Sequence, residues 1–186
     1  MNTLNTTTRY GWLSVTLHWV MLALVVGVYG CILLSNSFPK GSDTRNGLKT
    51  WHFMLGLSVF SLVWVRLVAR WFSPTPLIEP PIPAWQHTAA HFLHLALCAF
   101  MVGMPLLGWL ILSAAGQPVP FFGLQLPALM GQNNDWADLL KDVHETGATV
   151  GYFLIGLHAA AALYHHYFLR DNTLSRMLPQ SRKAPD

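Results

Sequence analysis

Residues 144–165 read HETGATVGYFLIGLHAAAALYH, and this stretch decides the fold class. No charged residue lies between Glu145 and Arg170. This interval is long enough for one helical crossing of an apolar membrane core, which takes about 20 residues. Within it a histidine or glycine recurs every seven positions, at His144, Gly151, His158 and His165. Because seven residues are close to two helical turns, these residues predict one stripe on one face of a membrane-spanning helix.

The composition of the whole chain agrees with a membrane protein. Of its 186 residues, 53% are hydrophobic and only 10% are charged, against about 25% charged in soluble domains. Eight Trp, ten Phe and five Tyr exclude a disordered chain. The net charge of +3 comes from scattered basic residues, which argues against nucleic-acid binding. Cys31 and Cys98 lie within apolar runs and are interpreted as packing residues.

Uncharged intervals predict an all-α membrane protein with four spanning helices, at about residues 12–34, 51–72, 87–114 and 144–168. We treat residues 1–186 as a single membrane-embedded domain. Asp142 and Glu145 are expected near the start of the fourth helix, where its dipole favours acidic groups. The proline-rich connector 73–86 predicts an extended strap. Residues 116–130, with three prolines, predict a loop or a short interfacial segment.

The distribution of basic residues predicts an orientation. With four spans, both termini share a side with the second connector, and that side carries Arg9, Arg66, Arg70, Arg170, Arg176, Arg182 and Lys183. The opposite side carries Lys40, Arg45, Lys49 and Lys141. This excess favours both termini in the cytoplasm. The first span lacks a small-residue cleavage site after it, so we interpret it as a helix of the mature protein rather than a signal peptide.

The nine histidines of this apolar chain need an explanation, because ionisable groups at membrane depth are costly and usually functional. His144 and His158 lie about 21 Å apart along a helix, so they need separate partners. By depth, His18 matches His158 near the side of the termini, and His52 matches His144 near the opposite side. Two such pairs, with Gly151 between them, favour two haems with two histidine ligands each. Separate packing histidines and a zinc site are the competing hypotheses; a closed zinc site needs four clustered ligands.

Several motifs resemble the bacterial cytochrome b561 family. They are His144-Glu145-Thr146-Gly147, the run from Gly151 to Ala162, His165-His166-Tyr167-Phe168, Asp171-Asn172-Thr173-Leu174, Leu17-His18-Trp19, Trp51-His52, Val65-Arg66, Ser73-Pro74-Thr75-Pro76, and His91 and His94 with Pro105. The resemblance covers nearly the whole chain and is weakest between Ala115 and Val143. It implies a four-helix bacterial inner-membrane cytochrome with two b-type haems. Its axial ligands would be His18 with His158 and His52 with His144, in agreement with the depth argument.

Relatives of this kind act as superoxide oxidases, which pass electrons from periplasmic superoxide to ubiquinone. The resemblance therefore implies a superoxide:ubiquinone oxidoreductase. His165 is a candidate partner for a quinone, and His91 and His94 are candidates for quinone or haem propionates. The charges on the side away from the termini sum to minus one and give no support to steering of an anion. A relay subunit docked to a separate dehydrogenase and a haem-free membrane protein remain alternatives, and the oligomeric state is open.

Overall fold

A computed structural model of the chain describes residues 3–178. Its long elements are four helices, α1 (Trp12–Ser35), α2 (Asp43–Trp71), α3 (Ala84–Ala114) and α4 (Asn134–Tyr164). A short π-helix, η1 (His165–Leu169), continues α4. All four helices are long and apolar enough to cross a membrane. The predicted four-helix membrane fold is confirmed.

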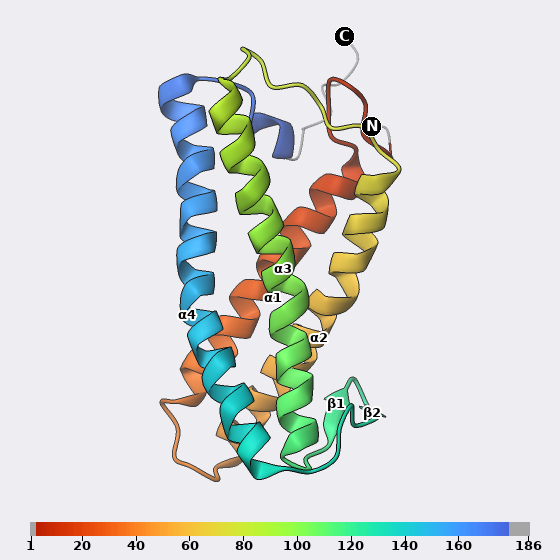
Figure 1. Cartoon of the computed structure of the whole chain (residues 1–186), viewed down its shortest axis with the longest axis vertical. Coiled ribbons are helices and arrows are strands. Elements are labelled where there is room, and N and C mark those ends of the chain that lie inside the picture. Colours follow the sequence, from red (N-terminus) through yellow and green to blue (C-terminus); the bar gives the residue numbers. More distant parts are fainter. Residues whose placement is uncertain (1–2, 179–186) are drawn as a thin grey trace.

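The four helices run up and down in a bundle (Figure 1). The start of α1, the α2–α3 connector and the end of α4 lie at one end, which we call the terminal end. The opposite end carries the hairpin described below, and we call it the hairpin end. The most extensive contacts join α1 to α2 and α3 to α4, and α2 also packs on α3. The bundle therefore consists of two helix pairs joined through α2 and α3.

Three helices begin earlier than the sequence predicted, and for α3 the difference is small, since it begins at Ala84 rather than near His87. α2 begins at Asp43 rather than near Trp51, and the Ser42 side chain caps it by accepting a hydrogen bond from the Arg45 amide. α4 begins at Asn134 rather than near His144, with Asn133 as its cap. Uncharged intervals mark only the apolar part of a helix, whereas hydrogen bonding continues into polar turns outside the membrane. Asp142 and Glu145 consequently lie inside α4.

The segment predicted as a loop contains a β-hairpin. Strands β1 (Val119–Phe121) and β2 (Leu124–Leu126) pair antiparallel around a Phe122–Gly123 turn. Both turn residues have positive φ, 46° and 85°, as a two-residue type I′ turn requires. Val119 is buried with Leu57 of α2 and Leu112 of α3, so the hairpin is anchored to the bundle. Pro120 is tolerated because the sheet has only edge strands.

At the terminal end the strap, residues 72–83, is held by a segment that follows α4. We call residues 170–178 the C-terminal clamp. The Arg176 guanidinium donates to the carbonyl oxygens of Pro76 and Leu77, and the Asn172 side chain accepts from the Glu79 amide. The Trp19 indole of α1 donates to the Met177 carbonyl at 2.7 Å. The clamp thus ties α1, the strap and α4 together.

Most apolar side chains point outward rather than into a core. The strongly apolar part of each helix is 6–17% buried within the chain, so its outer face suits lipid. Trp12, Trp71 and Trp85 are exposed at helix ends of the terminal end. Trp and Tyr favour the membrane–water interface because they are amphipathic.

Candidate functional site

The structure places four histidines in two pairs at different depths. The terminal-end pair is His18 of α1 and His158 of α4, with ring centres 6.1 Å apart. The hairpin-end pair is His52 of α2 and His144 of α4, with ring centres 6.2 Å apart. These are the two pairs that the sequence predicted. Their role as ligands stays a prediction.

The spacing within each pair fits a metal ion between two imidazoles. A metal bound at about 2 Å from one nitrogen of each ring leaves the ring centres roughly 6 Å apart. Residues 3–178 contain no group of three or more His, Cys, Asp or Glu side chains arranged to hold a metal ion. Two imidazoles are sufficient as the axial ligands of a haem iron. The donor sets therefore fit bis-histidine haem better than a closed zinc site, which needs four ligands.

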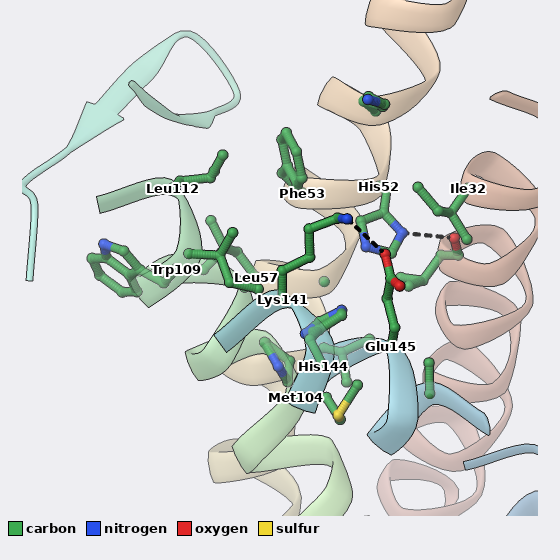
Figure 2. Close-up of a pocket in the computed structure, with 18 of the residues that line it drawn as sticks. Ile32, His52, Phe53, Leu57, Met104, Trp109, Leu112, Lys141, His144 and Glu145 are labelled. Atoms are coloured by element: carbon green, nitrogen blue, oxygen red, sulfur yellow. Dashed lines mark hydrogen bonds and ion pairs between the residues drawn. The ribbon is translucent and has the colours of Figure 1, made fainter. Parts of the chain in front are cut away.

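A cavity of about 670 Å³ surrounds the hairpin-end pair, a size typical of cofactor sites. Apolar side chains of α2 and α3, among them Phe53, Leu57 and Trp109, form much of its wall, and Lys141 and Glu145 lie beside His52 (Figure 2). The His52 Nδ1 atom lies 2.9 Å from the Val28 carbonyl oxygen. This contact makes Nδ1 the donor, so the lone pair of Nε2 is available to a metal. The cavity fits the cofactor implied by the donor set.

Between the two pairs, Gly151 allows a close approach of three helices. A Cβ atom at this position would overlap the Phe100 ring of α3 and the Tyr29 hydroxyl of α1. The Tyr29 hydroxyl donates to the Ala148 carbonyl oxygen at 2.8 Å. We call Tyr29, Phe100 and Gly151 the partition. Gly147 likewise faces Met104 of α3, so the glycine face of α4 packs inside the chain.

A cation and a third histidine flank the terminal-end pair. The Arg66 Nη1 atom lies 3.1 Å from His18 Nδ1, so Arg66 points into the bundle, whereas Arg70 is exposed. Because a guanidinium can only donate, His18 Nδ1 accepts in this contact, and a metal at His18 Nε2 would require the contact to open. His94 of α3 lies beside His158, with ring centres 5.3 Å apart. His91, by contrast, is exposed and its ring lies against that of Phe92. Of the two candidates on α3, only His94 is thus next to a predicted ligand.

His165 follows His158 by seven residues. It is paired with an acid, Asp171, that was not a candidate site residue from the sequence. Its Nδ1 atom lies 2.5 Å from a carboxylate oxygen of Asp171, whose side chain is fully buried. Burial alone would raise the pKa of Asp171, but hydrogen bonds from His165 and the Thr173 backbone hold that pKa below its usual range. The sequence signal was weak, because a lone acid six residues after a histidine has no characteristic helical spacing.

The fold and the paired histidines define a class, the membrane cytochromes of the b type, which carry electrons on haem held between helices. The profile of the family described as "Prokaryotic cytochrome b561" matches residues 9–180. The chain belongs to this prokaryotic cytochrome b561 family, whose members transfer electrons in the membrane on b-type haem. The resemblance seen in the sequence is confirmed.

Three relatives match nearly end to end. "Cytochrome b561 homolog 1" of Escherichia coli (strain K12) is 38% identical, over 94% of this chain and 99% of the relative. "Probable superoxide oxidase CybB" of Yersinia pestis is 36% identical, over 94% of this chain and 98% of the relative. "Cytochrome b561 homolog 2" of Escherichia coli (strain K12) is 29% identical, over 97% of each chain.

Proposed function

We propose that the protein binds two haem b groups and passes single electrons across the bacterial inner membrane, from periplasmic superoxide to ubiquinone. His18 and His158 would hold one haem, and His52 and His144 the other. The observation that carries this proposal is the pair of ring separations, 6.1 and 6.2 Å, at two levels of one bundle. A haem iron bound by two imidazoles is six-coordinate and supplies outer-sphere one-electron transfer.

The protein's own residues shape each level differently. At the hairpin end, the Val28 carbonyl orients His52. At the terminal end, the Arg66 guanidinium lies against His18. A buried cation favours extra negative charge nearby, which supports electron flow from the hairpin-end level to the terminal-end level.

Superoxide is the proposed donor, and its site would be the mouth of the hairpin-end cavity. Lys49 and Lys141 line this cavity together with the acids Asp138 and Glu145. Lys141 is paired with Glu145 at 3.3 Å, which leaves Lys49 and Asp138 in the lining. Lys49 is the cation that would attract an anion. The relative named a probable superoxide oxidase supports this choice of donor.

Ubiquinone is the proposed acceptor at the terminal end. His165 would contact a quinone oxygen there, and His94, beside His158, would bind quinone or a haem propionate. His91, which is exposed on α3, would bind the same groups at the membrane interface. Two one-electron steps would reduce one quinone.

We further propose that the terminal end faces the cytoplasm, so that both termini are cytoplasmic. Arg9, Arg70, Arg170 and Arg176 lie in the segments of the terminal end. Arg182 and Lys183, which also entered the charge count, lie outside the described residues. The hairpin end would then face the periplasm.

The test is a haem count and a reduced-minus-oxidised absorption spectrum of the purified chain, followed by addition of superoxide and ubiquinone. We expect two haems per chain and quinone reduction without another protein. Haem without quinone reduction, and co-purification with a dehydrogenase, would instead identify a relay subunit. A colourless protein produced with ample haem would contradict the proposal.

Ligand variants test the pairing itself. His52→Ala and His158→Ala should each lower the count from two haems to one, and the remaining haem should stay reducible. His87→Ala is the matched control because His87 is exposed outside both pairs, and it should retain two haems. If neither ligand variant loses a haem, the assignment of His52 and His158 is wrong.

A further inference from the structure

The end of α4 departs from regular helix where His165 stands. The helix widens into the π-helix His165–Leu169, a local form that is frequent at functional sites. Arg170 then adopts a left-handed conformation, with φ 55°, and reverses the chain. The Asp171 amide returns to donate to the His165 carbonyl oxygen at 3.2 Å. This turn brings the Asp171 carboxylate to the imidazole of the residue that began it.

The Asp171 carboxylate is fixed on both oxygens. One oxygen lies 2.5 Å from His165 Nδ1, and the other accepts from the Thr173 amide at 2.8 Å. The carboxylate has no exposed surface, while the His165 side chain is 15% exposed. An ionised carboxylate can only accept hydrogen bonds, so His165 Nδ1 carries a proton. The other ring nitrogen, Nε2, has no hydrogen-bond partner within residues 3–178.

An apolar surface adjoins this imidazole. Tyr164 and Phe168 stack with ring centres 5.4 Å apart, and both are exposed at the end of the helix. A quinone ring arriving from the membrane could pack on such aromatic faces. His165 would then be the neighbouring polar group, about 10 Å along α4 from His158.

We propose that Asp171 is a positioning residue that holds His165 as the proton donor to a quinone at the terminal end. This proposal rests on the proposed function, which supplies the electrons and the quinone. Reduction of a quinone to a quinol takes two electrons and two protons. In each transfer the protonated His165 releases its Nε2 proton to a quinone oxygen, keeps its Nδ1–H bond to Asp171, and regains a proton from water.

The experiment compares an acceptor that needs protons with one that does not. The purified protein with its haems is reduced, mixed rapidly with short-chain ubiquinone or with ferricyanide, and haem reoxidation is followed by absorbance. Asp171→Asn should slow reoxidation by ubiquinone tenfold or more, since positioned proton transfer contributes about 10²–10⁴-fold. Reoxidation by ferricyanide, which takes an electron without a proton, should stay at the wild-type rate. Asp171→Glu should restore part of the ubiquinone rate.

A matched control separates this effect from a general effect of charge. Asp142→Asn removes an exposed acid elsewhere on α4 and should leave both rates unchanged. In protein labelled with ¹⁵N-histidine, the hydrogen-bonded Nδ1 proton of His165 should give an NMR signal that disappears in Asp171→Asn and in His165→Gln. This signal does not depend on turnover.

Each outcome decides the proposal. Equal slowing of both acceptors would show that Asp171 is only a structural latch, and an unchanged ubiquinone rate would show that it has no part in proton delivery. If Asp171→Asn loses haem, His165→Gln provides the same comparison, because it leaves the backbone bonds of residue 171 in place. A wild-type protein without haem would contradict the proposed function instead.

Discussion

Gly151 shows how one residue controls the interior of the bundle. The seven-residue spacing predicted that this glycine would lie on the histidine face of α4, between the two histidine pairs. The structure places Tyr29 and Phe100 there. The spacing could predict that α4 has no side chain at this point of its inner face, but not which side chains of α1 and α3 occupy the space. That choice depends on the packing of three helices, which no local pattern encodes.

A pair of glycine variants tests the partition. Gly151→Ala should lower the thermal unfolding midpoint, because overpacking costs about 1–3 kcal/mol and the new Cβ overlaps Phe100 and Tyr29. Gly156→Ala is the control, since a Cβ there meets nothing within 4 Å. It should be neutral or gain up to about 1 kcal/mol of helix propensity. Circular dichroism of both variants in detergent measures the difference, and equal midpoints would contradict the close packing.

For the histidines, too, the sequence predicted the positions on α4, while some of the contacts depend on how the helices pack. The repeat at His144, His158 and His165 predicted a common face of α4, and matching depths selected His18 and His52 as partners. The structure brings these rings together as expected. The contact of Arg66 with His18 was not predicted, because the sequence position of Arg66 suited lipid headgroups equally well. Only the rotation of α2 in the bundle turns Arg66 inward.

At the scale of elements, the uncharged intervals predicted the apolar spans but missed their polar ends. The caps Ser42 and Asn133 start α2 and α4 well before the uncharged intervals. Both are residue types that favour helix starts, so a search for caps would have found these starts. The C-terminal clamp could not be predicted from the sequence, because its hydrogen bonds join residues about 100 positions apart, as between Arg176 and Pro76.

The clamp should loosen in acid. The pKa of Asp171 is lower in the folded protein than its usual value of about 3.9. Its hydrogen bonds therefore contribute fully above about pH 4 and are lost as pH falls through the lower folded-state pKa. Amide hydrogen exchange of residues 171–178 should be slower in wild type than in Asp171→Asn at neutral pH. The difference between the two should shrink as pH falls through the folded-state pKa of Asp171, and a difference that does not shrink as pH falls below about 4 would contradict this role of the carboxylate.

For the whole molecule, the low charge content indicated a membrane protein, and the uncharged intervals along the chain predicted the four-helix fold. The side of the membrane rests on a modest excess of basic residues. One of them, Arg66, points into the bundle and not to the surface. The structure thus weakens one contribution to the charge asymmetry, while Arg70, Arg170 and Arg176 remain in the segments of the terminal end.

Reporter fusions test the orientation. Alkaline phosphatase, which folds only in the periplasm, should be inactive when fused after Asp186 and active when inserted at Gly41. Gly41 lies in the exposed connector between α1 and α2 at the hairpin end. The reverse pattern would place both termini in the periplasm and would exchange the proposed donor and acceptor faces.

The partition of Tyr29, Phe100 and Gly151 bears on how the protein matures. Because this wall lies between the two histidine pairs, the two haems of the proposed function would occupy separate compartments. Insertion at one level need not wait for the other. Cells short of haem should therefore accumulate half-filled chains, and the order of filling would reflect which compartment opens more readily to arriving porphyrin.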